Sequence, residues 1–505
     1  MKNFVILFCL FLMSYSLMAQ APGFNNIYQT EHPRNFLYQL LIDNDTIVGL
    51  GTAYNDSTNW DAGLLLTKFD SNGVLINHSI IIDSTGGSYF IDRTWGNILK
   101  TDDGGYIFTA TPEGYEYPIV IKTDHDFNVI YKQNYIDSAI IGYATVKLKK
   151  TLNGYLLFGA AYYPSTSFDG FIRKIDEAGN TLWLKYYGFV GLDENVLDIE
   201  HINDSTYLIA TVEGLNTTSA RSSLKVIDAL GGVLEQWHSE PEPEVGYFRN
   251  IITVNDNYIM TYGLSQVQVL PNGTQVLKSA ISKFDYNLTP QWTKLYGRKV
   301  SLNSELRFFD FDKTLDGNYV ATGRISYPII DFANSTGWLM KFSPDGDSIW
   351  WRLDTAILAP ALYGNLHSLI SSGILSSGSI VSGGTVEKGS EKHIWLIKVT
   401  NDGCLDTLYC GLVNALEEGQ KANIAVRAFP NPATAYLEVD YSPMQGQAAK
   451  LYLSNFLGRW VGVFELDSYS TRHQIPLDGL PNGQYFYSIL KDGQRVSTGK
   501  FIKLE

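Results

Sequence analysis

Short apolar runs alternate with turn residues along most of the chain, and helical periodicity is absent. Typical segments are "DDGGYIFTA" from Asp102, "LNGYLLFGA" from Leu152 and "LDGNYVATG" from Leu315. In each of them a turn dipeptide opens an apolar or alternating run that ends on a small residue, which is typical of a β-strand entered from a tight turn. The pattern predicts an all-β chain that is built largely from hairpins.

One three-residue step recurs along the chain at a nearly constant interval. It consists of a lysine, a hydrophobic residue and an aspartate, and the successive intervals are 54, 52, 52, 57, 58 and 57 residues. Such a period indicates a repeat fold, in which each unit buries its faces against its neighbours. The lysine column consists of Lys68, Lys122, Lys174, Val226, Lys283, Lys341 and Lys398, and the acidic column of Asp70, Asp124, Asp176, Asp228 and Asp285, followed by Ser343 and Thr400.

Each unit is predicted to hold two hairpins, and therefore four strands, which make one blade of a β-propeller. The second hairpin turns at a glycine that follows Asn72, Ala178, Asp345 or Asp402. Asn-Gly and Asp-Gly favour type I′ turns, which need positive φ at both central positions. We expect the lysine step to pair charges at a strand end. It is no candidate for catalysis, because a reaction needs one site and this step recurs around the ring.

The repeats predict seven blades over residues 20–412, with six or eight as the alternatives because the first and last units are irregular. Trp183, Trp292 and Trp350 each follow the lysine of their unit by nine residues, and we expect them to pack between blades rather than stack on a ligand. The segment Phe24–Thr30 can supply a strand to the last blade and close the ring. The blades resemble bacterial surface propellers grouped with kelch-like and quinoprotein-like repeats, and they carry no cofactor motif.

The first residues have the pattern of a secretory signal peptide. Lys2 supplies a positive charge, Phe4–Met13 is an apolar run too short to span a bilayer, and Ala19 before Gln20 fits a cleavage site. We therefore predict a signal peptide over residues 1–19, with a membrane anchor as the alternative. No transmembrane segment is expected after cleavage, because no later apolar run is long enough.

Two cysteines remain after that cleavage, Cys404 and Cys410 in "GCLDTLYC". In an exported chain such a pair favours a disulfide, and this one is expected to fasten the seam of the ring. Metal ligation and a reactive thiol are the alternatives, although no companion His or Cys lies nearby.

Composition and charge limit the partners. Aromatic residues make up 13% of the chain and there are 45 glycines, which suits strands and tight turns. The net charge is −14 at pH 7, and nucleic-acid binding depends on clustered Lys and Arg. Nucleic acid is therefore excluded as a partner, unless a local basic patch exists.

The repeat stops before a different C-terminal piece. Residues 413–427 read as a polar linker, and Leu437, Val439 and Tyr441 then alternate with acidic residues as in a half-buried strand. We predict a small β-sandwich over residues 428–505.

Motifs within this piece resemble the type IX secretion C-terminal sorting domain, type A. They are the FPNP run, the Leu-Gly-Arg step, the LPNGQY turn and the terminal KFI, in that order up to the chain end. The resemblance implies export to the periplasm, then passage by the type IX machinery across the outer membrane of a Gram-negative cell to the surface or the medium. The residues that carry it are Phe429, Pro430, Asn431, Pro432, Gly458, Gly483, Tyr485 and Lys500.

No catalytic residue can be assigned from the sequence. The eight histidines lack metal-ligand spacing, and no nucleophile elbow, P-loop or dinucleotide motif is present. Aspartate pairs at 43–45, 124–126 and 345–347 can supply oxygens to calcium, although turns are the favoured interpretation. We therefore predict no metal and no cofactor, with calcium as the alternative. Carboxylates from several blades can also converge on the axis, as glycoside hydrolysis requires.

Aromatic residues in mid-blade segments at 113–118, 160–168 and 324–332 suggest a glycan ligand, because exposed rings stack on sugars or on partner side chains. The alternative is that these rings cover blade edges. The sequence thus predicts an exported propeller that acts as a binding or adhesion module for a glycan or a surface protein. The alternatives are a secreted polysaccharide hydrolase or lyase and a structural surface component.

Overall fold

The computed structural model divides the chain into two compact units, residues 1–414 and 415–505, and each is described by itself. All elements in the described residues are β-strands, and no helix long and apolar enough to cross a membrane occurs among them. The described residues are 23–54, 62–83, 89–91, 97–112, 117–163, 168–188, 193–214, 221–239, 250–254, 258–269, 275–296, 305–326, 335–356, 365–388, 391–405, 426–441, 449–455, 460–467, 471–491 and 494–504.

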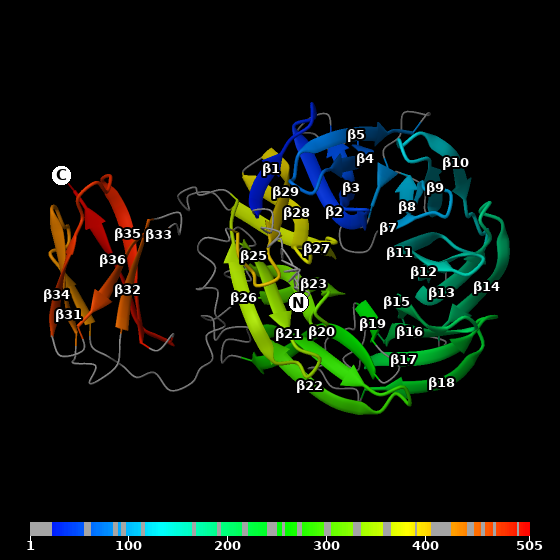
Figure 1. The fold of residues 1–505 in the computed structure, drawn as a ribbon. Coiled ribbons are helices and arrows are strands. Elements are labelled where there is room, and N and C mark those ends of the chain that lie inside the picture. The colour runs from blue at the N-terminus through cyan, green and yellow to red at the C-terminus, as the bar shows by residue number, and fades with distance from the viewer. Residues whose placement is uncertain are drawn as a thin grey trace, which may run out of the picture. The chain divides into compact units, whose positions relative to one another are not determined.

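The described strands of the larger unit form seven four-stranded groups around a centre, here called blades 1 to 7 (Figure 1). Within each blade the first strand is innermost and the fourth is outermost. Blade 1 consists of β2 (Arg34–Asp43), β3 (Thr46–Tyr54), β4 (Ala62–Phe69) and β5 (Leu75–Ile81). Blade 2 consists of β7 (Ile98–Lys100), β8 (Tyr106–Pro112), β9 (Ile119–Thr123) and β10 (Val129–Asn134), and the short strand β6 (Tyr89–Phe90) also pairs with β8. Blade 3 consists of β11 (Gly142–Thr151), β12 (Gly154–Tyr162), β13 (Phe168–Ile175) and β14 (Thr181–Tyr187). Blade 4 consists of β15 (Glu194–Asn203), β16 (Thr206–Glu213), β17 (Arg221–Asp228) and β18 (Val233–His238), and blade 5 of β19 (Asn250–Val254), β20 (Tyr258–Val269), β21 (Gln275–Phe284) and β22 (Pro290–Tyr296). Blade 6 consists of β23 (Glu305–Lys313), β24 (Tyr319–Ser326), β25 (Ser335–Phe342) and β26 (Ser348–Asp354). Blade 7 consists of β27 (Asn365–Ile374), β28 (Ile380–Lys388), β29 (Glu391–Val399) and β1 (Phe24–Tyr28).

The first strand of the chain completes the last blade. β1 pairs antiparallel with β29, and Trp395 Nε1 donates to Asn25 Oδ1 at 2.6 Å. On its other side Tyr28 reaches blade 1, where its hydroxyl donates to the carbonyl of Gly73 and its ring centre lies 4.6 Å from that of Phe69. The prediction that this segment closes the ring is confirmed.

Apolar side chains fill the spaces between neighbouring blades. Leu156, Phe158 and Ile172 of blade 3, for example, share one buried cluster with Val196 and Ile209 of blade 4. Each blade therefore covers both faces with its neighbours, which a four-stranded sheet cannot do alone. The tight turns after the first and third strands lie at one end of the blades, here the turn end. The connections after the second and fourth strands leave from the opposite end, here the loop end.

The acidic column of the repeat caps the turn after the third strand. Asp70 Oδ1 accepts the amides of Asn72 and Val74, at 2.9 and 2.8 Å. The equivalent pair of bonds is made by Asp124, Asp176, Asp228 and Asp285, and by the hydroxyl of Ser343.

Each of these turns has one residue with positive φ. It is a glycine in four of them, for example 79° at Gly73 and 77° at Gly346, and it is Phe127 or Leu288 in the turns that begin at Asp124 and Asp285. The amide of Asp70 also donates to the carbonyl of Val74, at 2.9 Å. The predicted type I′ turns are therefore wrong: the turns are longer, and the aspartate stabilises them by accepting amides that would otherwise lack a partner.

Several lysines of the column link neighbouring blades. Lys283 Nζ donates to the carbonyl of Pro344 in the next blade at 3.1 Å, and Lys398 Nζ crosses the seam to the carbonyl of Ser71 at 2.7 Å. The predicted charge pair at a strand end is confirmed in part: Lys122 pairs with Asp103 and Lys341 with Asp316, each at 2.6 Å. The aspartate of the step itself accepts turn amides instead.

The tryptophans pack between blades, as predicted. A Cβ at Gly346 would lie 2.6 Å from Trp292, and one at Gly403 would lie 2.8 Å from Trp350, so these turns press against the aromatic ring of the preceding blade. Tyrosine hydroxyls add a second link from each of three blades to the turn of the next blade. The hydroxyls of Tyr135, Tyr187 and Tyr296 donate to the carbonyls of Gly179, Gly231 and Gly346, at 2.7, 2.9 and 2.7 Å.

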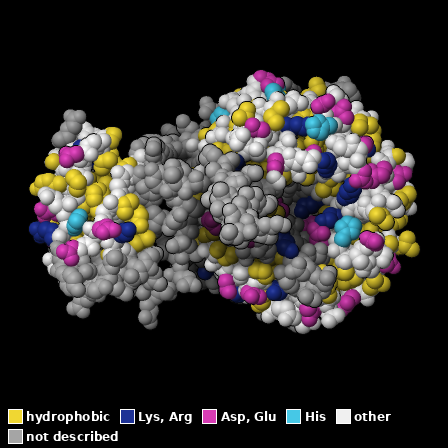
Figure 2. Space-filling model, in the orientation of Figure 1, with side chains coloured by type: hydrophobic (Ala, Val, Ile, Leu, Met, Phe, Trp, Pro, Cys, Tyr) yellow, Lys and Arg dark blue, Asp and Glu magenta, His cyan; other side chains and the backbone are white. Residues whose placement is uncertain are grey.

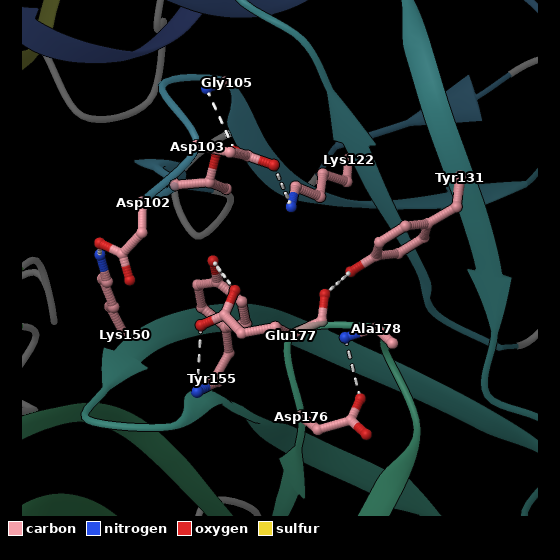
Figure 3. A network of polar contacts seen from close by, with 12 residues as sticks. Asp102, Asp103, Gly105, Lys122, Tyr131, Lys150, Tyr155, Asp176, Glu177 and Ala178 are labelled. Carbon is pink, nitrogen blue, oxygen red and sulfur yellow. Dashed lines mark hydrogen bonds and ion pairs between the residues drawn. The ribbon is translucent and has the colours of Figure 1, made fainter.

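Figure 3 shows the polar contacts at the turn end of blades 2 and 3. Asp103 pairs with Lys122 at 2.6 Å within blade 2, and the Tyr131 hydroxyl donates across to the carbonyl of Glu177 at 3.4 Å. The Glu177 carboxylate accepts the hydroxyl of Tyr155 at 3.0 Å. These groups partner one another within and between the two blades, so the network holds turns in place.

The smaller unit contains two sheets, and their buried side chains, among them Leu437, Leu451, Ile475 and Phe501, form one cluster. One sheet has the order β30-β31-β34 and the other β33-β32-β35-β36. The strands are β30 (Val426–Phe429), β31 (Tyr436–Tyr441), β32 (Ala449–Asn455), β33 (Trp460–Leu466), β34 (Arg472–Pro476), β35 (Gly483–Lys491) and β36 (Gln494–Lys503).

Candidate functional site

Five innermost strands of the ring carry an irregularity at the same height. In β2, β11, β15, β23 and β27 the pairing register shifts next to one or two bulged residues, which turns the following side chains out of the regular pleat. The residues after these shifts are all polar or charged: Gln39, Lys147, Asp198, Asp310 and Ser371.

Three of the bulged residues pack into one apolar neighbourhood. Tyr38 of blade 1 and Ile370 of blade 7 belong to one buried cluster, and Phe309 of blade 6 packs against it. Three consecutive blades therefore present apolar side chains at this level, next to the polar residues that follow. Figure 2 shows that the visible face of the larger unit is hollowed near its centre, where basic and acidic side chains gather.

Two carboxyls lie on alternate positions of β23 and face the serines of β27. Asp310 Oδ2 accepts the hydroxyl of Ser371 at 3.1 Å and the amide of Ser372 at 3.2 Å. Asp312 Oδ2 accepts the hydroxyl of Ser372 at 2.6 Å. Both aspartates keep part of their surface accessible. Blades 6 and 7 thus share a carboxyl pair that is hydrogen-bonded on one side.

Burial raises the pKa of both carboxyls, and the charge of Asp310 raises the pKa of Asp312 further. Lys147 lowers and Asp198 raises the pKa of Asp310. These two residues belong to blades 3 and 4, which are not neighbours of blade 6, so their charges act across the centre of the ring. The pair therefore retains a proton at a pH where an ordinary aspartate is ionised.

Two residues further along the inner strands, Lys149 and Glu200 form an ion pair between blades 3 and 4. The centre of the ring thus holds an acid, carboxylates, ammonium groups, an amide and hydroxyls from several blades. Such a set can hydrogen-bond a ligand rich in hydroxyl groups, and its carboxyl pair can exchange a proton.

The carboxyl pair predicts an unusual dependence of stability on pH. Because the folded-state pKa of Asp312 is raised, folding takes up a proton above pH 4, and stability falls as the pH rises through the folded pKa. Asp312→Asn keeps an oxygen for Ser372 but never ionises. We expect the variant to match the native chain near pH 4.5 and to exceed it by about 2 kcal/mol at pH 8.5, since one pKa unit is worth about 1.4 kcal/mol. Thermal unfolding of both chains across this range measures the difference.

Asp103→Asn is the control of opposite sign. The hydrogen bond from Lys122, with that from Thr101, lowers the pKa of Asp103 to about 2. Its contribution is therefore present above pH 4 and lost as the pH falls, so the variant should be slightly less stable at neutral pH and equal near pH 2. If the unfolding temperatures of the native chain and of Asp312→Asn change equally with pH, Asp312 does not retain a proton.

The aspartate pairs considered for calcium serve as structural links. Asp43 accepts the hydroxyl of Tyr106 at 3.1 Å and pairs with Lys100, both in blade 2. Asp347 pairs with Lys294 at 2.7 Å. Across the described ranges no group of three or more His, Cys, Asp or Glu side chains is placed to hold a metal ion.

The aromatic segments are described in part, since residues 113–116, 164–167 and 327–332 lie outside the described residues. Tyr162 is 37% exposed, with its ring centre 4.9 Å from that of Phe168. Tyr163 lies 5.7 Å from Tyr186, which is 36% exposed and donates to Asp137 at 3.1 Å. These rings pack along the edge of blade 3 at the loop end and keep exposed surface there.

Several predicted residues are outside the described part of the chain: Ala19, Gln20, Cys410 and Gly458. Cys404 is buried in the turn after β29, and its amide donates to Thr400 Oγ1 at 3.1 Å. The Cys404–Cys410 disulfide therefore stays a prediction.

The sorting motif joins the ends of the smaller unit. Asn431 Oδ1 accepts the amide of Ile502 at 3.0 Å, and the peptide bonds before Pro430 and Pro432 are cis. In the same unit, the guanidinium of Arg472 lies 5.1 Å from the ring centre of Phe429. Further along the motif, the Tyr485 hydroxyl donates to the Pro481 carbonyl at 2.7 Å, and Gly483 and Lys500 lie on the paired strands β35 and β36.

The carboxyls at the ring centre were missed at the sequence level. Asp310 and Asp312 stand in "FFDFDK", and Asp198 and Glu200 in "LDIEH". Carboxylates two residues apart inside an apolar strand share one side of it, which is the signal that could have found them.

Residues 427–504 match the family described as "Secretion system C-terminal sorting domain". No curated protein matches the chain. Among solved structures, the polysaccharide lyase Uly1 has 9% identity and a TM-score of 0.44, over 74% of this chain and 90% of the lyase. The α-L-arabinofuranosidase Arb93A from Fusarium graminearum has 8% identity and a TM-score of 0.41, over 75% and 97%. Drosophila Semaphorin 1b has 10% identity and a TM-score of 0.38, over 75% and 85%.

At these values the likenesses support no statement about activity. The fold is assigned from the strands of this chain, and the sorting domain from the match of its C-terminal segment. The protein is an all-β propeller followed, at residues 427–504, by a secretion system C-terminal sorting domain, which indicates that the type IX machinery carries it to the cell surface or the extracellular space.

Proposed function

We propose that the propeller is a binding module that takes a saccharide at the centre of the ring. The observation that carries this proposal is the convergence of Gln39, Lys147, Asp198, Asp310 and Ser371 from five blades. Hydroxyl-rich ligands need closely spaced donors and acceptors on fixed elements, and inner strands supply them. In this proposal residues 1–19 are the signal peptide, 20–412 the propeller, 413–427 a linker and 428–505 the sorting domain.

A second candidate function is hydrolysis of a glycoside. The retained proton on the Asp310–Asp312 pair favours it, because such reactions use one protonated and one ionised carboxyl. The serine donors on both aspartates favour binding instead, since they already occupy part of the carboxyl surface.

Incubation of the purified full chain with a panel of soluble oligosaccharides separates the two functions. Calorimetry measures binding, and assays for new reducing ends and for unsaturated ends measure cleavage. Binding without product supports the binding module. In that case we expect Asp310→Ala to lower the affinity for the saccharide about tenfold or more, because a charge-assisted hydrogen bond is lost. Product release that Asp312→Asn abolishes would establish the hydrolase. Absence of both binding and product contradicts the proposal.

A further inference from the structure

Tyrosine and aspartate side chains alternate across the loop end of blade 3, on the side that faces blade 2. Tyr143 of β11 is the direct partner of Ala161 in β12, and Ala161 is the direct partner of Asp169 in β13. Directly opposed residues of antiparallel strands point to the same side of a sheet. Ala161 shares a buried cluster with Val120 of blade 2, so this side of blade 3 faces blade 2.

Tyr186 brings the outermost strand β14 into the same group. Its direct partner is Phe171, whose ring centre lies 5.1 Å from that of Tyr143. The ring centre of Tyr186 also lies 5.7 Å from that of Tyr163. The three tyrosines and two nearby carboxyls, here called the tyrosine row, thus extend from the innermost to the outermost strand of the blade (Figure 1). Its members are Tyr143, Tyr163, Tyr186, Asp137 and Asp169.

The two carboxyls lie beside the tyrosine hydroxyls. Tyr186 donates to Asp137 Oδ2 at 3.1 Å. Burial raises the pKa of Tyr143, Tyr163 and Tyr186, and the charge of Asp137 raises each of these pKa values further. The charge of Asp169 also raises the pKa of Tyr163. All three hydroxyls therefore stay protonated near neutral pH and can donate hydrogen bonds.

The row keeps surface that a ligand can reach. Tyr186 is 36% exposed, and Tyr163, Asp137 and Asp169 are half-buried. The amide of Ala139 donates to Asp137 Oδ1 at 3.0 Å, so each oxygen of this carboxylate accepts one printed bond. An ionised carboxylate has about four acceptor sites, which leaves room for hydroxyl groups of a ligand. Rings already held by their neighbours lose little freedom when a ligand binds.

We propose that the tyrosine row binds a chain of neutral β-linked pyranoses, at a second site separate from the ring centre. Pyranoses with equatorial hydroxyl groups have apolar faces that stack on tyrosine rings, and their hydroxyl edges donate to carboxylates. Neighbouring strands lie about 4.8 Å apart, so the row spans about 14 Å and suits about three sugar residues. Asp137 and Asp169 repel acidic sugars, which makes a neutral chain the better ligand. This inference goes beyond the proposed function and uses none of its residues.

Calorimetry with the purified full chain tests this. The probes are cellohexaose and laminarihexaose, which differ in linkage, the disaccharide cellobiose, and an acidic hexagalacturonate. We expect one or both neutral hexasaccharides to bind at least tenfold more tightly than cellobiose and than hexagalacturonate, because only they cover the row without charge repulsion. The preferred linkage identifies the glucan, and either linkage supports the inference.

The double variant Tyr163→Ala/Tyr186→Ala should lower the affinity for the preferred hexasaccharide about tenfold or more, because two rings are lost. The same titrations in a chain that carries Asp310→Ala keep binding at the ring centre from masking this loss. Tyr186→Phe keeps the ring without the hydrogen bond to Asp137 and should retain most of the affinity, which guards against misfolding of the double variant. Tyr436→Ala is the matched control, because Tyr436 is 42% exposed but belongs to the smaller unit, and it should leave the affinity unchanged.

Three results overturn the inference: unchanged affinity in the double variant, an equal loss in Tyr436→Ala, or hexagalacturonate or cellobiose binding as tightly as the neutral hexasaccharides. If Asp310→Ala abolishes binding while the double variant binds normally, the inference fails and the proposed function stands. If only the double variant loses binding, the tyrosine row is the binding site and the proposed function fails. If no saccharide binds, both fail.

Discussion

A chain that ends at residue 426 is expected to be absent from the cell surface and the medium, although the cell still makes it. Residues 427–504 match a secretion system C-terminal sorting domain, and without them the type IX machinery has no signal to recognise. The smaller unit has its own buried cluster, so its removal leaves the core of the larger unit intact. Cell fractionation and antibody labelling of intact cells, in a host with this machinery, measure the effect.

The reciprocal experiment is the control for that deletion. Residues 415–505, fused behind an unrelated exported domain, should bring that domain to the surface. The same domain fused to a neutral linker should stay inside. Normal surface display of the truncated chain would show that the sorting signal lies elsewhere.

Removal of residues 24–28 is expected to lower the free energy of unfolding of the propeller by about 3–6 kcal/mol, because the last blade loses its outer strand and the seam loses two aromatic side chains. Phe24 lies 5.8 Å from Lys398 Nζ, and the ring of Tyr28 packs on blade 1. Thermal unfolding should show a midpoint about 4–7 °C lower. Limited proteolysis should then cut blade 7 first.

Tyr28→Phe separates the strand from its hydrogen bond. It removes only the hydroxyl that donates to Gly73 and should cost about 1 kcal/mol. If the deletion lowers the free energy of unfolding by no more than Tyr28→Phe does, the ring holds together without β1.

The fold could be predicted because its signals are local. Turn glycines, apolar runs and the lysine step repeat in each blade, and each of them specifies a turn or a link that the next few dozen residues complete. The turn geometry was harder, since Asn72-Gly73 suits two turn types and the choice depends on the carboxylate of Asp70. Local sequence did not show that this aspartate is an acceptor for amides.

The candidate site was not predictable in the same way. Asp310 and Asp198 stand far apart in the sequence, and only closure of the ring brings their charges within reach of each other. The pairing of Arg34 with Lys392 is a similar case, because it forms only across the seam between the first and the last blade. The alternation in "FFDFDK" gives the side of the strand but not the partners in other blades.

Pairing of Phe24 with Lys398 also sets the order in which the protein can mature. The ribosome makes β1 first and its partner almost four hundred residues later, so this contact carries the largest loop-closure entropy in the propeller and forms last. Until the final blade has been synthesised, β1 has no edge to join and blade 1 keeps one uncovered face. An incomplete chain therefore remains open and is available to proteases, so ring closure doubles as a check that the propeller has been made in full.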